Sequence, residues 1–178
     1  LFIYLILFLV LCAAFFVRVY RIDQVLGFYY DQGRDALVIW DLIHKGKLFL
    51  IGPTTGIAGI FRGPWYYYLI APFYLIGGGD PIWPSVFLSF TTVVSLFFLY
   101  ILGKEIGGRL AGLLAVTIGS FSFYLVYASR WLSNPTPMLL ISTLLIWSML
   151  SAVKKKKWAW PAIAFLVGMA LQFGSAAE

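Results

Sequence analysis

The sequence predicts an all-α, polytopic membrane protein with about five transmembrane helices and interfacial helices in its first extracytoplasmic loop. The first observation behind this fold class is the composition, because the 178 residues are 62% hydrophobic and only 11% charged. Soluble domains are about half apolar and about a quarter charged, so lipid is indicated as the main solvent. The second observation is that long apolar runs alternate with short basic segments. The third is one long polar stretch that holds most of the acidic residues.

Each apolar run is close to the length that a helix needs to cross the hydrocarbon core of a bilayer. The predicted transmembrane helices cover residues 1–17, 82–102, 110–127, 136–153 and 158–175, and the outer loop covers 18–81. The sequence begins without methionine and stops just after an apolar run. We therefore expect residues 1–178 to be the N-terminal part of the transmembrane module of a longer protein.

The distribution of lysine and arginine predicts which loops face the cytoplasm. Lys154, Lys155, Lys156 and Lys157 lie between two apolar runs, and 103–109 is a second short basic loop. The positive-inside rule places both loops in the cytoplasm, so the outer loop and the loop at 129–135 face the other side. The net charge of +6 would also suit nucleic acid, but the basic residues do not form the patch that such binding needs. The composition favours a prokaryotic plasma membrane.

A predicted helix in the outer loop carries two carboxylates and an arginine. Asp31 has the character of its N-cap, and the helix ends at Lys45 before Gly46. Asp31 and Asp35 are one turn apart, on the same side of this helix. The remaining apolar stripe would lie on a membrane surface or on neighbouring helices; it contains Ala36, Ile39, Trp40 and Ile43.

A second helix of the outer loop begins at Pro64 and ends near residue 76, and is too short to span. Its Tyr66, Tyr67 and Tyr68 are expected to anchor it at headgroup level, with one ring lining a donor pocket. The glycine-rich connection at 52–59 before it lacks the Gly-Lys-Ser/Thr ending of a phosphate-binding P-loop.

The predicted topology places several charged residues together on the extracytoplasmic face. They are Asp31, Arg34, Asp35, Arg62 and Arg130. Arginine pairs well with the phosphate of a lipid-linked donor. A carboxylate beside it can take a proton from an acceptor hydroxyl. The leaving group would then be an anionic lipid phosphate, which needs cationic stabilisation.

The order of the motifs resembles the N-terminal part of the polytopic type C glycosyltransferases, which include protein O-mannosyltransferases and the aminoarabinose transferase of lipid A. The motifs are Asp31-x-x-Arg34-Asp35-Ala36 entering a helix, Phe61-x-x-Pro64-x-x-Tyr67-Tyr68, Leu102-Gly103-Lys104-x-x-Gly107-Gly108-Arg109 and Tyr127-x-Ser129-Arg130. The resemblance covers essentially all 178 residues. It implies that Asp31 is the catalytic base of an inverting transferase that moves a hexose or pentose from a polyprenyl-phosphate donor. It implies that Arg34, Asp35, Arg62, Tyr67, Arg130 and Asn134 bind substrate.

The chain departs from this resemblance at three positions. Gln32 stands where the family often has a second acid, and Asn134 stands where many members have an acid after the third span. Gly63 stands where some relatives have a lysine that contacts the donor phosphate, and Arg62 would substitute for it. Because an amide is a poor ligand for a hard cation, no metal residues are predicted, and a divalent cation stays open as a cofactor.

The expected partners are a polyprenyl-phosphate-linked sugar, membrane lipid and an acceptor that the sequence does not identify. Two other functions stay open. One is a transporter of lipid-linked substrates. The predicted spans carry no charge in their middle, and this counts against a transporter. The other is a non-catalytic membrane scaffold, which the departures at Gln32 and Asn134 would suit.

Overall fold

The computed structural model describes residues 2–53 and 59–174, and these residues fold into helices without a β-strand. The predicted all-α class is therefore confirmed for the described part of the chain. Most of the connection expected at 52–59 lies outside the described residues. The helices are α1 (Phe2–Val19), α2 (Ile22–Val25), α3 (Tyr30–Lys45), α4 (Trp65–Ile76), α5 (Ile82–Phe121), α6 (Phe123–Arg130), α7 (Met138–Val153) and α8 (Ala159–Phe173).

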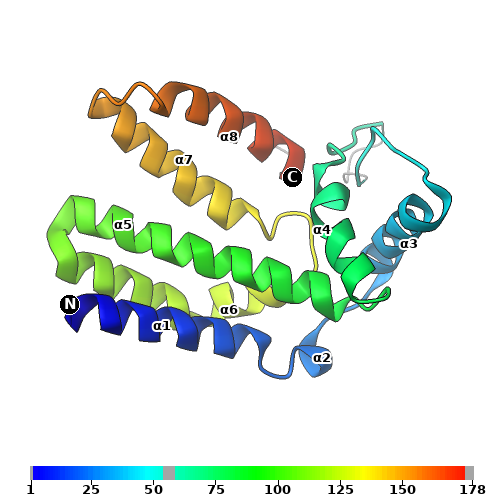
Figure 1. The fold of residues 1–178 in the computed structure, drawn as a ribbon, viewed down its shortest axis with the longest axis horizontal. Coiled ribbons are helices and arrows are strands. Elements are labelled where there is room, and N and C mark those ends of the chain that lie inside the picture. The colour runs from blue at the N-terminus through cyan, green and yellow to red at the C-terminus, as the bar shows by residue number, and fades with distance from the viewer. Residues whose placement is uncertain (1, 54–58, 175–178) are drawn as a thin grey trace.

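The long helices form a bundle, and the short helices gather at one of its ends. Figure 1 shows α1, both halves of α5, α7 and α8 running roughly side by side, with α2, α3 and α4 at the end where α8 finishes. The layers follow from the contacts: α1 packs on α5, α5 on α7, and α7 on α8. Helix α3 reaches the bundle through α4, which contacts both α5 and α8.

Helix α5 is two helices joined by a sharp turn at Gly107 and Gly108, whose backbone angles are not helical. The backbone of Gly108 has a φ of 81°, a value that residues with a Cβ rarely adopt. The turn falls within the predicted basic loop at 103–109. Beyond it the two halves lie close, because a Cβ on Gly103 would stand 2.8 Å from the Cα of Gly112.

The prediction of one helix over 110–127 is wrong. Helix α5 ends at Phe121, Ser122 is extended with ψ of 122°, and α6 begins at Phe123. An unbroken helix would pair the carbonyls of Gly119 and Ser120 with backbone N–H groups four residues later. Arg18 of α1 takes these carbonyls instead, donating from Nη1 to Ser120 at 3.0 Å and from Nη2 to Gly119 at 3.3 Å.

Both basic loops lie at the end of the bundle opposite α3 and α4. Figure 1 shows the turn of α5 and the connection between α7 and α8 at the same end as the N-terminus. An ion pair of 2.8 Å between Lys154 and Glu105 joins the two loops. The loops are therefore on one side of the bundle, as the sequence predicts.

Two helices of the described chain, α1 and α5, are long and apolar enough to cross a membrane, with mean hydropathies of 2.7 and 2.2 over a stretch of 18 residues in each. Helices α7 and α8 are apolar but shorter. The number of five spans stays a prediction.

Candidate functional site

The acidic helix of the outer loop begins two residues earlier than expected. Tyr29 is the N-cap of α3, so the predicted cap role of Asp31 is wrong. The backbone N–H of Tyr29 donates to Oε1 of Gln32 at 3.0 Å, and Nε2 of Gln32 donates to the carbonyl of Leu132 at 3.1 Å. Gln32 thus caps α3 and ties it to the loop after α6, and Asp31 is left in the first turn.

Arg34 bridges the two carboxylates of α3. Its Nη1 donates to Oδ1 of Asp31 at 2.9 Å, and its Nη2 donates to Oδ1 of Asp35 at 2.8 Å. Its Nε also donates to Asp35 at 3.0 Å. The Asp31 side chain is 68% exposed, whereas that of Asp35 is 9% exposed. The two acids therefore share one guanidinium but have opposite environments.

Tyr67 of α4 completes this group, which we call the Arg34 cluster: Asp31, Arg34, Asp35 and Tyr67. The Tyr67 hydroxyl donates to Oδ1 of Asp35 at 2.9 Å. Burial raises the pKa of the Asp35 carboxyl, and the hydrogen bonds and charge of Arg34 together with Tyr67 oppose this rise. Burial and the negative charge of Asp35 raise the pKa of Tyr67, so its hydroxyl stays protonated and acts as the donor.

The tyrosine run at the start of α4 is not the headgroup anchor that the sequence predicts. Tyr66 is 0% exposed and Tyr67 is 3% exposed, whereas Trp65 is 53% exposed. Tyr68 donates to the carbonyl of Phe49 at 2.8 Å. The first two rings pack in the core between α3, α4, α5, α7 and α8, on the face of α4 that also buries Ile70, Ala71 and Tyr74.

A cavity of about 300 Å³ lies beside the cluster, and we call it the Arg34 cavity. Both Arg34 and Tyr67 line it, together with Asp41 and Lys47. Lys47 Nζ is 3.8 Å from Asp41 Oδ2, and its side chain is 71% exposed. Sequence reasoning missed Lys47, because only its position two residues after the end of α3 pointed to it.

Arg62 and Gly63 lie just before α4. The backbone of Arg62 pairs with Gly52 and Pro53 across two hydrogen bonds of 2.9 Å. A Cβ on Gly63 would stand 1.2 Å from Oε1 of Gln172, on α8. The space that a longer side chain would need at position 63 is therefore occupied by Gln172.

The hydrogen bonds of Arg130 and Asn134 go to backbone carbonyls and not to the Arg34 cluster. Nη2 of Arg130 donates to the carbonyls of Val17 and Tyr20, at the C-terminal end of α1. Nδ2 of Asn134 donates to the carbonyl of Phe173, and Asn134 is 4% exposed. The structure thus brings Asp31, Arg34, Asp35 and Tyr67 together, and both Arg130 and Asn134 contact backbone carbonyls at helix ends.

A family model for dolichyl-phosphate-mannose-protein mannosyltransferases matches residues 62–174. This match covers more than half of the chain. The chain belongs to this family. The resemblance to type C glycosyltransferases is therefore confirmed. No curated protein and no solved structure matches the chain.

The mannosyltransferase family match begins at Arg62, so α3 and its acids lie N-terminal to it. Two hydrogen bonds tie α3 to the matched part, one from Tyr67 to Asp35 and one from Gln32 to Leu132. Family membership and the apolar helices together indicate an integral membrane glycosyltransferase. Within the described residues, no three His, Cys, Asp or Glu side chains are grouped so as to hold a metal ion.

Proposed function

We propose that this chain is the catalytic N-terminal part of a glycosyltransferase that moves a sugar from a polyprenyl-phosphate donor to an acceptor on the extracytoplasmic face. The observation that carries this proposal is the exposed Asp31 carboxylate, which Arg34 holds at 2.9 Å while Asp35 braces Arg34 from the buried side. An exposed acid fixed by a partly buried ion pair is accessible to an acceptor and is held in one orientation.

Asp31 acts as the general base in this reaction. It accepts the proton of an acceptor hydroxyl while that oxygen attacks the anomeric carbon of the donor sugar. The bond from the anomeric carbon to the phosphate oxygen breaks, and the electron pair leaves with the lipid phosphate. Because the attack and the departure occur on opposite sides of the carbon, the configuration inverts.

The Arg34 cavity is the proposed place of the donor phosphate. Arg34 and Lys47 supply positive charge on its lining, and Tyr67 lines the same space. Cations aimed at the oxygen on which charge develops stabilise an anionic leaving group. Arg62, just before α4, is proposed to approach the phosphate from the adjoining loop. Binding of donor by Arg130 and Asn134 stays a prediction.

Transfer of a labelled sugar from polyprenyl phosphate by the purified complete protein tests this proposal. We expect Asp31→Asn to lower transfer by at least about 100-fold, within the range that a general base contributes. Asp23→Asn, at an exposed position of α2, is the matched control and should retain transfer. Each variant is first shown to insert into membranes and to elute as one species.

Unchanged transfer by Asp31→Asn would remove Asp31 from the mechanism. The same assay separates the other two functions, because a transporter or a scaffold leaves the donor intact. A protein that moves labelled donor across vesicles without breaking it would be a transporter, and one that does neither would be a scaffold.

A further inference from the structure

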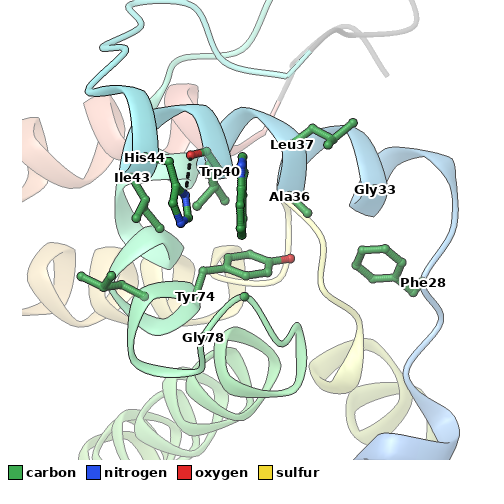
Figure 2. A pocket seen from close by; sticks show the side chains of 12 residues that line it. Phe28, Gly33, Ala36, Leu37, Trp40, Ile43, His44, Tyr74 and Gly78 are labelled. Atoms are coloured by element: carbon green, nitrogen blue, oxygen red, sulfur yellow. Dashed lines mark hydrogen bonds between the residues drawn. The ribbon is translucent and has the colours of Figure 1, made fainter.

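A second and larger cavity lies on another side of α3, and the proposed reaction does not use it. Its volume is about 630 Å³, and it lies between α3 and the segment that runs from the end of α4 to the turn before α5. We call it the Tyr74 cavity. Its lining includes Phe28, Ala36, Leu37, Trp40 and Tyr74. Figure 2 shows the Trp40 ring on the lower side of α3, the Tyr74 ring beneath it, and the Phe28 ring to the right.

One buried polar atom in this lining has no hydrogen-bond partner among the described residues. The Tyr74 hydroxyl is buried without a hydrogen bond, and the residue is 3% exposed. In Figure 2 this hydroxyl points away from His44, toward the side on which Phe28 lies. Burial, with the negative charges of Asp35 and Asp80, raises the pKa of Tyr74, so the hydroxyl is a donor. A buried donor without an acceptor is costly, which indicates that a ligand oxygen satisfies it.

The rest of the lining selects an apolar ligand. His44 stacks on Trp40 with ring centroids 3.6 Å apart, and its Nδ1 lies 3.1 Å from the carbonyl of Trp40. Leu37 and Leu75 line the cavity and are 70% and 62% exposed, so apolar side chains continue from it to the surface. A sugar would need several polar partners here, and an isoprenoid chain would offer the Tyr74 hydroxyl no oxygen along its length.

We propose that the Tyr74 cavity binds one ester-linked acyl chain of a membrane phospholipid, whose ester carbonyl accepts a hydrogen bond from the Tyr74 hydroxyl. The ester groups of a bilayer lie at the boundary between headgroups and chains, where half-exposed aromatic residues such as Trp40 are enriched. The proposal depends on an interfacial position for α3 and α4 and is independent of the chemistry at Asp31.

Photolabelling of the complete protein tests occupancy. The protein is reconstituted with a phosphatidylcholine that carries a diazirine on one acyl chain, and labelled peptides are mapped by mass spectrometry. We expect label on residues 33–43 and 74–79. Gly33→Leu should reduce this label at least about fivefold, because Gly33 lines the cavity and a Cβ there is 3.9 Å from Phe28. Gly168→Leu is the matched control, since a Cβ on Gly168 meets nothing within 4 Å.

Competition between lipids tests the hydrogen bond without depending on the folding of Gly33→Leu. An ester-linked phospholipid should displace the label at a concentration roughly fivefold lower than its ether-linked analogue, the ratio that one hydrogen bond supplies. Tyr74→Phe should remove that preference and leave the two lipids equal. Equal competition in the unaltered protein would overturn the proposal. So would unchanged labelling of folded Gly33→Leu, or displacement by polyprenyl phosphate at a lower concentration than by phospholipid. Sugar transfer is a separate readout, so either proposal can fail alone.

Discussion

At the scale of single residues, Asp31 and Asp35 show how one helix gives two aspartates different properties. Both pair with Arg34, yet Asp31 stays in solvent and Asp35 packs against Tyr67. Burial of Asp35 disfavours its charged form and raises its pKa. The accessible acid is suited to exchange a proton with substrate, whereas the buried acid is suited to fix the arginine.

The raised pKa of Asp35 makes a prediction about pH and stability. Above the ordinary value of 3.8, the folded protein holds more protons on Asp35 than the unfolded chain does, so stability falls as pH rises toward the folded pKa. Asparagine does not titrate. We therefore expect the thermal unfolding midpoint of the unaltered protein, minus that of Asp35→Asn, to decrease from about pH 4 to about pH 7.

Asp41 on the same helix is the control, because its pKa is shifted in the opposite direction to that of Asp35. The hydrogen bond from Lys45 lowers the pKa of Asp41, so its contribution to stability is present above the ordinary pKa and lost as pH falls. The corresponding difference for Asp41→Asn should therefore rise as pH increases toward the ordinary value of 3.8 and stay nearly level from about pH 4 to about pH 7. An increase for Asp35→Asn between about pH 4 and about pH 7 would show that the ion pair with Arg34, and not desolvation, governs Asp35.

Arg18 and Arg130 each donate hydrogen bonds to backbone carbonyls at the end of a neighbouring helix. Arg18 of α1 donates to carbonyls near the end of α5, and Arg130 at the end of α6 donates to carbonyls at the end of α1. Arg18 is 0% exposed and also donates to Ala14 at 2.9 Å. The last carbonyls of a helix have no intrahelical donors, so these guanidinium groups satisfy them.

Replacing Arg18 with lysine should lower the free energy of unfolding by about 1–3 kcal/mol. A single ammonium group cannot reach the three carbonyls that the planar guanidinium joins. Urea unfolding in detergent measures the change. Arg109→Lys, at an exposed position in the turn of α5, should change the value by less than about 0.5 kcal/mol. Equal values for the two variants would show that the buried guanidinium is not needed for stability.

At the scale of elements, the two halves of α5 depend on glycine where they approach each other. A Cβ on Gly103 would contact the backbone of Gly112, so the halves would have to separate. Backbone atoms cannot move aside as a flexible side chain can, and the packing of α1 and α7 on α5 would be disturbed as well.

Gly103→Ala should therefore destabilise the protein by about 1–3 kcal/mol, as overpacked positions do. Gly168→Ala is the matched substitution on α8, where the added methyl group meets nothing. Alanine favours a helix over glycine, so this control should be neutral or stabilising by up to about 1 kcal/mol. Thermal unfolding of the two variants measures these changes. A higher unfolding midpoint for Gly103→Ala would contradict the close approach of the two halves of α5.

At the scale of the whole molecule, the bundle has two chemically different ends. One end holds the basic loops, joined by Lys154 and Glu105, and the other holds α3, α4 and the Arg34 cluster. From the positive-inside rule we expect the lysine end to lie in the cytoplasm, and we propose that the Arg34 cluster faces outward.

Labelling with a membrane-impermeant maleimide in intact cells tests this orientation. The single native cysteine, Cys12, is first replaced by serine. Leu50→Cys, at a position that is 90% exposed in the loop after α3, should react from outside. Lys156→Cys should react only after the membrane is permeabilised. The reverse pattern would place the Arg34 cluster in the cytoplasm and contradict the proposed site of transfer.

The sequence by itself determined the helical class, the acidic helix up to Gly46, the turn near Gly107 and the family. Composition, glycine position and short motifs are local properties, so one chain is enough to read them. Only the tertiary structure decided that Gln32 ties α3 to the loop after α6, that Tyr66 and Tyr67 are buried, and that Arg18 binds the carbonyls where the third predicted span is broken. Each of these depends on contacts between residues 32 and 132, 35 and 67, or 18 and 120, which are distant in the chain. Burial and hydrogen bonding at such distances arise from packing, and packing is not a local property of the sequence.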